Sequence, residues 1–292
     1  MKRLICFFFL ISIIFSINFA SCKFGVQQAF YRKNQVNERS REIKNFCGTE
    51  NDPAVNTDKF SVAVITDIHF GRLASDKKEK FKIWYEAKKT EVAASGYPVK
   101  FAICLGDVSE SGEKKQIEQY VSFCSELFPD KKIYTVVGNH DLYNDGWTHF
   151  KRDVYPHCSS FMFKTEYGGK SLSWYFLDTA NGTLGKPQLE DLLSKIKSDS
   201  NPKIVSTHYP IYAGGGQLFT MQNENERDLL LSTFLKNNVK LLLGGHWHKY
   251  EEYTYKNHFK EYNFASFVDH SQAAIIKVDL NSMDIGVQCS KF

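Results

Sequence analysis

Six short, nearly continuous apolar runs between residues 60 and 243 constrain the fold of this chain more than any other feature. Strands that are buried on both faces have this pattern, because none of their side chains faces water. Segments with helical spacing lie between several of the runs, at 117–128 and at 189–196. Alternating strands and helices predict right-handed crossover units and a largely parallel sheet. The six runs are 60–66, 99–105, 132–137, 173–177, 203–207 and 239–243.

The remaining patterns after residue 58 extend this α/β prediction. Phe81 with Trp84 and Leu230 with Phe234 mark two weaker helices. The last forty residues contain short aromatic-rich runs without clear helical spacing, which predicts antiparallel strands that add to a second sheet. We therefore expect one folded domain over residues 58–292.

The first residues predict export from the cytoplasm. An apolar run over 4–17 follows Lys2 and Arg3, and small residues come next. This length suits a secretory signal peptide over residues 1–21 and is short for a membrane span, with a retained N-terminal anchor as the alternative. Removal of the segment lowers the formal net charge from +4 by two positive charges. A net positive charge this small does not favour a nucleic-acid partner.

The end of the predicted signal, Phe19-Ala20-Ser21-Cys22, resembles the lipobox of bacterial lipoproteins, with Phe19 in place of the usual Leu. The resemblance implies a lipid on Cys22 that holds the protein on a bacterial membrane outside the cytoplasm. Cleavage near the same point, which would release a soluble secreted protein, is the alternative. Residues 22–57 are polar and lack sustained apolar periodicity, so we expect a solvated and partly helical tether.

The cysteines beyond Cys22 do not predict a metal site, because no CxxC spacing occurs. Cys104 lies in an apolar run and Cys124 on a helical face, so both are expected to be small core residues. Five cysteines cannot all pair, and a Cys47–Cys289 disulfide is one option that the sequence leaves open.

Polar residues follow five of the apolar runs at the points where the strands would end. In open α/β sheets ligands bind at the carboxyl ends of the strands, so we expect these residues to meet at one edge. Each group taken singly is more typical of a turn, a cap or an exposed histidine. Burying all of them together would be unfavourable without a neutralising charge. The groups are Asp67 with His69, Asp107, Asn139 with His140 and Asp141, His208, and His246 with His248.

In chain order these groups form the set DxH, GD, GNHD, H and GHxH, which resembles the calcineurin-like metallophosphoesterase family. The resemblance covers residues 60–250. It implies two packed mixed β-sheets flanked by helices, in a four-layer α/β/β/α architecture. It also implies a metal-dependent hydrolase of phosphate esters. Carboxylate, amide and imidazole ligands without thiolates suit two Mn, Fe or Zn ions.

The same resemblance assigns a role to each polar group. The two ions would lie roughly 3.5–4 Å apart and share a hydroxide that attacks phosphorus in line with the leaving oxygen. The first ion would be bound by Asp67, His69, Asp107 and His248. The second ion would be bound by Asp107, Asn139, His208 and His246.

His140 corresponds by resemblance to the catalytic histidine that lies beside the substrate rather than on a metal. Asp141 would accept a hydrogen bond from its ring, with a capping role in a turn as the alternative. Glu110 stands three residues after Asp107, where purple acid phosphatases have a metal-binding Tyr. This difference argues against a coloured iron site of that kind.

Substrate selection is expected outside these motifs. Residues 209–219 contain three glycines and several aromatic residues directly after His208, which favours a pocket-lining loop over a flexible surface connection. Tyr143, Asn144 and Trp147 are further candidates for the same pocket.

The expected substrate is a small phosphate ester. The similarity of the segment HYPIY to acid-phosphatase-like members slightly favours a phosphomonoesterase over a phosphodiesterase or nucleotide hydrolase. The absence of a basic stripe from the sequence disfavours a nuclease. A non-catalytic scaffold that kept the fold is the alternative from another class. Such a protein should have an incomplete ligand set, whereas every motif is present here.

Overall fold

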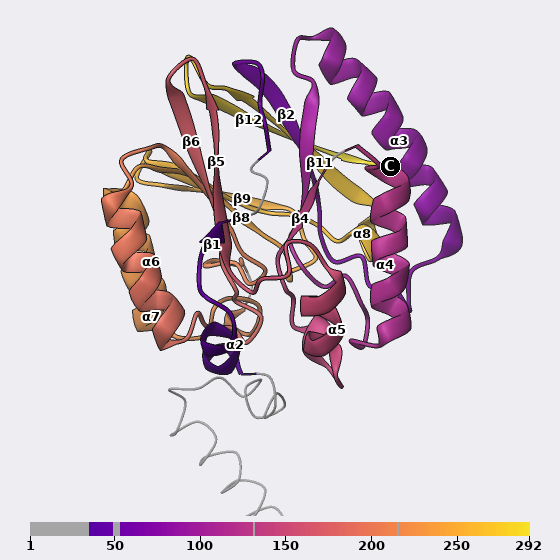
Figure 1. Cartoon of the computed structure of the whole chain (residues 1–292), viewed down its shortest axis with the longest axis horizontal. Helices are drawn as coiled ribbons and strands as arrows, with labels where there is room; N and C mark the ends of the chain where they lie inside the picture. The colour runs from indigo at the N-terminus through magenta and orange to yellow at the C-terminus, as the bar shows by residue number, and fades with distance from the viewer. Residues whose placement is uncertain (1–34, 49–52, 131, 215) are drawn as a thin grey trace, which may run out of the picture.

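The computed structural model of the chain describes residues 35–48, 53–130, 132–214 and 216–292. Two mixed β-sheets pack face to face, and helices cover their outer faces, which gives the predicted four-layer α/β/β/α architecture (Figure 1). The predicted signal peptide over 1–21 and Cys22 lie outside the described residues. Within the described ranges, no helix combines the length and apolar character that a membrane span requires.

The larger sheet has seven strands. Its four central strands, β6, β7, β8 and β10, are parallel to one another. Antiparallel strands pair with β6 and β10, and a two-residue strand lies at one edge. In sheet order the strands are β1 (Cys47–Gly48), β5 (Phe161–Tyr167), β6 (Lys170–Phe176), β7 (Lys203–Ser206), β8 (Val239–Gly244), β10 (Phe259–Asn263) and β9 (Glu251–Tyr255).

The smaller sheet has five strands. Its strands β2, β3 and β4 are parallel, while β11 is antiparallel to both β2 and β12. In sheet order they are β12 (Asp284–Lys291), β11 (Gln272–Asp279), β2 (Lys59–Ile65), β3 (Val99–Cys104) and β4 (Ile133–Thr135). All six predicted runs are therefore strands, three in each sheet, and the predicted antiparallel strands at the C-terminus are confirmed in β11 and β12.

Four predicted helices are confirmed. Helices α3 (Ser75–Ala94) and α4 (Lys114–Leu127) cover the smaller sheet, and α6 (Lys186–Ser198) and α7 (Glu224–Lys236) cover the larger one (Figure 1). The sequence did not predict the short helices α5 (Gly146–Asp153) and α8 (Phe267–His270) or the 3₁₀ turns η2 (His140–Leu142) and η3 (Gln217–Phe219). Helix α2 (Val36–Glu42) lies in the segment that was expected to be partly helical.

The continuous apolar runs are explained by burial on both faces of each sheet. In β2, Val62 and Val64 pack into the core between the sheets, whereas Ala63 and Ile65 pack against the helices outside. Two apolar layers therefore enclose each central strand, and little polar surface remains within it. Cys104 and Cys124 are buried in the helix-covered core, as predicted.

Residues 35–48 differ from the solvated tether that we expected over residues 22–57. Arg39 is buried and forms two 2.7 Å hydrogen bonds to the carboxylate of Asp178, together with one of 2.9 Å to Asn181. A buried guanidinium is tolerated when such paired bonds satisfy it. These contacts attach the segment to the domain that we predicted to begin at residue 58.

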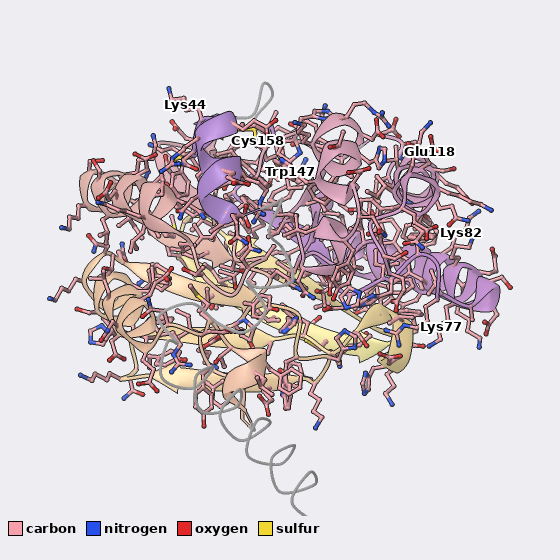
Figure 2. All side chains as sticks on the ribbon, turned by 90° about the horizontal axis from the view of Figure 1, so that it is seen from below. Lys44, Lys77, Lys82, Glu118, Trp147 and Cys158 are labelled. Carbon is pink, nitrogen blue, oxygen red and sulfur yellow. A yellow bond between two sulfur atoms is a disulfide. The ribbon has the colours of Figure 1, made fainter. Side chains whose placement is uncertain are left out.

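The disulfide also differs from the option considered from sequence. Cys47 pairs with Cys158, while Cys289 is free. The bridge joins β1 to the segment that precedes β5, so it fastens residues 35–48 to the larger sheet. Trp147 supports the same attachment, because its indole nitrogen donates to Glu42 at the end of α2. Trp147 and Cys158 are labelled in Figure 2.

Candidate metal centre

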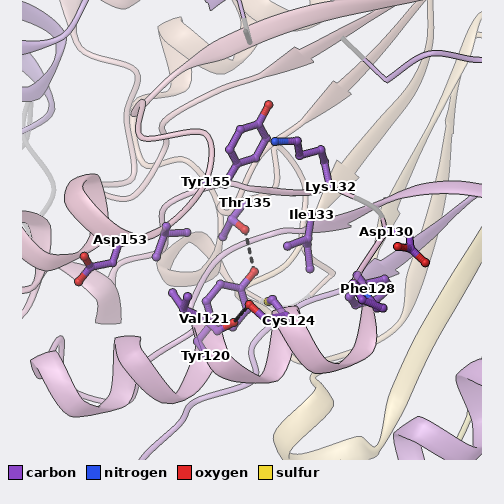
Figure 3. Close-up of a pocket in the computed structure, with 13 residues that line it drawn as sticks. Tyr120, Val121, Cys124, Phe128, Asp130, Lys132, Ile133, Thr135, Asp153 and Tyr155 are labelled. Carbon is purple, nitrogen blue, oxygen red and sulfur yellow. Dashed lines mark hydrogen bonds between the residues drawn. The ribbon is translucent and has the colours of Figure 1, made fainter. Parts of the chain in front are cut away.

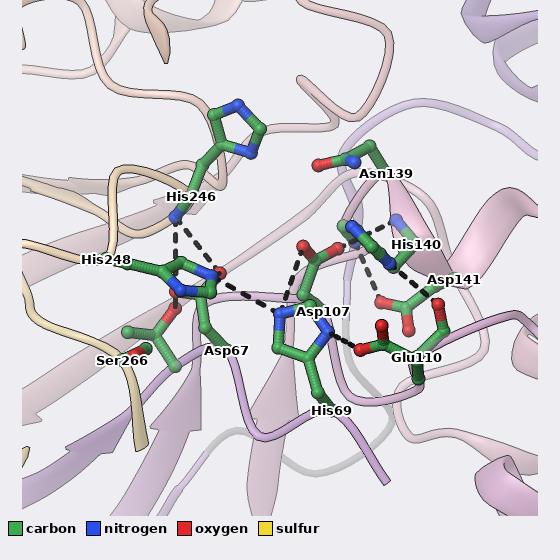
Figure 4. A network of polar contacts seen from close by, with 12 residues as sticks. Asp67, His69, Asp107, Glu110, Asn139, His140, Asp141, His246, His248 and Ser266 are labelled. Atoms are coloured by element: carbon green, nitrogen blue, oxygen red, sulfur yellow. Dashed lines mark hydrogen bonds and ion pairs between the residues drawn. The ribbon is translucent and has the colours of Figure 1, made fainter. Parts of the chain in front are cut away.

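The loops after β2, β3, β4, β7 and β8 bring the predicted polar residues to one edge of the two sheets (Figure 4). Five of these residues have positive φ angles between 50° and 63°, a conformation uncommon for residues other than glycine. Such conformations persist where the surrounding structure enforces them, and they concentrate at functional sites. The five residues are Asp67, His69, Asp107, His246 and His248.

The first cluster contains Asp67, His69 and His248, whose ligand atoms all lie within 4.8 Å of one another. Nε2 of His248 is 3.3 Å from Oδ1 of Asp67 and 3.3 Å from Nε2 of His69. These are three of the four residues that the resemblance assigns to the first ion, the fourth being Asp107. Their donor atoms converge closely enough to hold one cation.

The second cluster contains Asp107, His208 and His246, again within 4.8 Å of one another. Nε2 of His208 is 3.0 Å from Oδ1 of Asn139 and 3.3 Å from Oδ2 of Asp107. Asn139 therefore joins this cluster through its amide oxygen. The structure brings together all four side chains that were predicted for the second ion.

Asp107 lies between the two clusters. Its Oδ2 atom is 3.7 Å from Nε2 of His69 and 3.3 Å from Nε2 of His208. Its other oxygen, Oδ1, accepts a 2.8 Å hydrogen bond from the backbone N–H of His140. One carboxylate oxygen is thus within reach of both clusters, as a bridging ligand requires.

The surroundings of the His246 ring indicate whether these residues fit a metal ion. Its ring stacks on Tyr209 with centroids 3.7 Å apart, and its Nε2 atom is buried without a hydrogen-bond partner among the described residues. Burial, together with His208, lowers the pKa of His246 to about 3, so the ring is neutral. A neutral imidazole with an unused nitrogen beside two carboxylates is suited to Mn, Fe or Zn.

The charges of the two clusters are already paired in the metal-free protein. Burial would lower the pKa values of His208 and His248, but Asp107 raises the first and Asp67 the second, each to about 9. Burial alone would raise the pKa of Asp67, but His248 and His208 lower it to about 2. Two imidazolium–carboxylate pairs therefore occupy positions where a cation would replace protons.

A second group of charged residues supports the first cluster from outside. Nδ1 of His248 forms a 2.8 Å hydrogen bond with Oδ2 of Asp269. Nδ1 of His69 is also 2.8 Å from Oε2 of Glu110, but this contact lacks the alignment of a hydrogen bond. Arg72 contacts both carboxylates, at 3.2 Å from Glu110 and 3.0 Å from Asp269. Carboxylates on the second ring nitrogen orient ligating histidines. Sequence reasoning missed Arg72 and Asp269, which belong to no motif.

His140 and Asp141 differ from the predicted pair. Nδ1 of the His140 ring is 2.7 Å from the backbone oxygen of Glu110, not from Asp141. The Asp141 carboxylate instead accepts hydrogen bonds from the backbone N–H groups of Ser109 and Gly138 and from the Ser109 hydroxyl. Burial and the nearby Asp107 raise the pKa of Asp141 to about 6. The alternative role for Asp141, in holding a turn, matches these contacts.

The predicted pocket residues are only partly brought to the site. The ring of Tyr143 lies 5.0 Å from that of His140, and the ring of Phe219 lies 6.1 Å from that of His246. Asn144 donates to the backbone oxygen of Ser111. The expectation for Trp147 is wrong, because its side chain is buried against α2.

One pocket lies away from these clusters. It has a volume of about 630 Å³ and lies between α4 and β4 (Figure 3). Tyr120, Lys132, Thr135 and Tyr155 are among the residues that line it, and the predicted site residues are not. The convergence of ionisable groups, rather than cavity size, identifies the candidate site.

Solved structures share this fold at low sequence identity. A dimetal phosphatase from Danio rerio has a TM-score of 0.58 at 11% identity, covering 78% of this chain and 98% of that one. A 5'-nucleotidase from Candida albicans SC5314 has a TM-score of 0.54 at 13% identity, covering 83% and 54%. The sulfate thiohydrolase SoxB from Thermus thermophilus has a TM-score of 0.51 at 11% identity, covering 82% and 58%. The chain thus spans little more than half of the last two proteins.

Sequence comparison gives a more specific result. No curated protein is significantly similar to the chain. A family model described as calcineurin-like phosphoesterase matches residues 60–250, which include every motif group identified above. The match covers most of the chain, and the chain shares its fold with the solved dimetal phosphatase. The chain therefore belongs to the calcineurin-like phosphoesterase family.

Proposed function

We propose that this phosphoesterase hydrolyses small phosphate monoesters outside the cytoplasm with the help of two metal ions. The observation that carries the proposal is the position of Asp107, whose Oδ2 atom is 3.7 Å from His69 and 3.3 Å from His208. A carboxylate in this position can bind two neighbouring cations at once. Such a bridge would hold two ions at the separation of roughly 3.5–4 Å that is found in two-metal hydrolytic sites.

The proposed ligands divide between the clusters as the family resemblance implies. When bound, two ions would supply a water nucleophile that is active near neutral pH and would neutralise charge on the phosphoryl oxygens. The first site consists of Asp67, His69, Asp107 and His248. The second site consists of Asp107, Asn139, His208 and His246.

His140 is the proposed catalytic histidine. A backbone oxygen can only accept a hydrogen bond, so the contact with Glu110 requires a proton on Nδ1 of His140. Nε2 is then the ring nitrogen left for the ester, and it can donate a proton to the leaving oxygen when the ring carries a second proton there. Asp141 assists indirectly by holding the turns that carry Asp107 and His140.

Export and membrane attachment form part of the proposal. We infer a signal peptide over residues 1–21 and a lipid on Cys22 from the sequence pattern. The disulfide between Cys47 and Cys158 supports an oxidising compartment outside the cytoplasm. Release of a soluble form remains the alternative to anchoring.

The proposal is tested by loading the purified chain with Mn²⁺, Fe²⁺ or Zn²⁺ and measuring hydrolysis of p-nitrophenyl phosphate and its bis-ester. We expect faster hydrolysis of the monoester. A faster rate on the bis-ester would instead support a phosphodiesterase. Failure to hydrolyse either ester or a panel of nucleotides would contradict a hydrolase and support the non-catalytic scaffold.

A further inference from the structure

We propose that Arg39 is a positioning residue for the second metal ion and that it acts through the turn of residues 178–181. This inference rests on the ligands assigned to that ion under the proposed function. Arg39 lies on α2, and only 1% of it is exposed. Its guanidinium donates hydrogen bonds to both carboxylate oxygens of Asp178 and to the side-chain oxygen of Asn181. One buried side chain therefore holds both ends of the turn.

The turn that Arg39 holds encloses Thr179. Oδ1 of Asp178 accepts a 3.2 Å hydrogen bond from the N–H of Ala180, which closes the backbone around Thr179. The N–H of Gly182 donates to the backbone oxygen of Thr179 at 2.7 Å. The Thr179 side chain is fully buried. The position of its hydroxyl is therefore set by the turn and by the guanidinium that holds it.

Thr179 in turn holds the strand end that carries a ligand of the second ion. Its Oγ1 atom accepts hydrogen bonds from the backbone N–H groups of His208, at 3.1 Å, and Tyr209, at 2.8 Å. The ring of Tyr209 stacks on His246 with centroids 3.7 Å apart. Both imidazoles assigned to the second ion are thus linked to Thr179. The imidazoles of the first site contact the carboxylates described above instead, so we expect Arg39 to affect the second site selectively.

Attachment of α2 alone does not account for a buried ion pair. Removing two charges from water has a large desolvation cost, and apolar side chains in their place often stabilise a contact equally well or better. Paired hydrogen bonds from a guanidinium instead fix the direction of a carboxylate. Asn45, which also attaches this segment, contacts Asp191 on α6 and Ser160 rather than the turn. We therefore expect Arg39 to set the geometry of the turn and Asn45 to contribute attachment only.

Stepwise Zn²⁺ affinities of the purified full chain, measured by competition with a chelator, test the inference. His246→Ala identifies the binding step of the second site, and His248→Ala identifies that of the first. Arg39→Met removes the donors at similar side-chain length, and Thr179→Val removes only the hydroxyl. Each should weaken the second site about 10- to 100-fold, the usual effect of losing a residue that orients a ligand, and change the first by less than about twofold.

Two further variants separate positioning from attachment. Thr179→Ser keeps the hydroxyl and should retain the wild-type affinity of the second site. Asn45→Ala removes another buried contact of the same segment and should leave both affinities within about twofold of the wild type. Hydrogen exchange in the metal-free chain gives a second readout. The amides of His208 and Tyr209 should exchange faster in Arg39→Met, while those of β2 should be unchanged.

Equal weakening of both sites in Arg39→Met, or a second site of wild-type affinity in that variant, would overturn the inference. An equal effect of Asn45→Ala would also overturn it, because attachment alone would then explain the loss. If Arg39→Met does not fold, Thr179→Val decides the question with the same expected loss. These measurements do not depend on turnover. A chain that binds two ions with this selectivity but hydrolyses no ester would contradict the proposed function and support the role of Arg39.

Discussion

Nδ1 of His248 lies 2.8 Å from Oδ2 of Asp269, a carboxylate 21 residues further along the chain. The contact directs the opposite ring nitrogen, Nε2, toward Oδ1 of Asp67 at 3.3 Å. A carboxylate that binds the second nitrogen of a ligating imidazole fixes the orientation of the ring and increases its basicity. Asp269 therefore supports the first cluster although it lies outside every motif.

Asp269→Asn removes the charge that His248 contacts but keeps the size of the side chain. We expect metal affinity to fall about 10- to 100-fold, because the imidazole becomes less basic and less well oriented. Competition with a chelator measures the affinity, and Asp284→Asn, an exposed carboxylate on β12, is the matched control. Equal affinity in the wild type and Asp269→Asn would contradict this role.

Metal binding should release protons at neutral pH. In the metal-free protein the pKa values of His208 and His248 are raised to about 9, so both rings are protonated at pH 7. A cation must displace these protons, and metal affinity should therefore rise with pH and level off above about 9. Calorimetry in buffers with different ionisation enthalpies should detect about two protons released per chain at pH 7. Release of no protons would contradict this assignment of charges.

His140→Ala should separate catalysis from metal binding. The ring contacts the Glu110 backbone and is not among the proposed ligands, so metal content should be unchanged. Turnover of p-nitrophenyl phosphate should fall by about 10²- to 10⁴-fold, the usual contribution of a general acid. His258→Ala, at an exposed turn before β10, is the control and should retain activity. Loss of metal from His140→Ala would show that this histidine is a ligand.

The Cys47–Cys158 disulfide should stabilise the folded domain. It closes a loop across a sequence separation of 111 residues, which restricts the unfolded chain. Cys158→Ser should lower the free energy of unfolding by about 2–5 kcal/mol in urea titrations without reductant. The matched control is Cys289→Ser, which removes a free thiol. An equal effect of the two substitutions would show that the bridge does not contribute to stability.

Local patterns were sufficient to predict the strands and the positions of most polar residues in the two clusters. The run over 60–66 is apolar throughout because β2 is buried on both faces, and Asp67 follows where the strand ends. The proximity of Asp67 and Asp107 also follows from topology, because the strands that precede them, β2 and β3, are adjacent and parallel. Their loops must therefore end at the same edge of the sheet.

Contacts that depend on tertiary placement could not be predicted in this way. Asp269 reaches His248 because the N–H of Phe267 bonds to the backbone oxygen of Thr66, which docks α8 beside the loop after β2. Arg39 lies in a polar segment, and its burial depends on Asp178, 139 residues away. No periodicity of either segment indicates these partners.

The predicted hydrogen bond from His140 to Asp141 failed for a local reason. The two residues are neighbours in a 3₁₀ turn, and consecutive side chains on such a turn point in different directions. Asp141 is directed into the protein toward Ser109 and Gly138, while His140 contacts Glu110. Adjacent positions in sequence did not imply contact between the side chains.

The central claim is that Asp107 joins two metal sites, and anomalous diffraction from crystals of the metal-loaded protein tests it most directly. We expect two peaks roughly 3.5–4 Å apart, with the Asp107 carboxylate in contact with both and the remaining ligands divided as proposed. A single peak, or two ions of which only one contacts Asp107, would contradict the account.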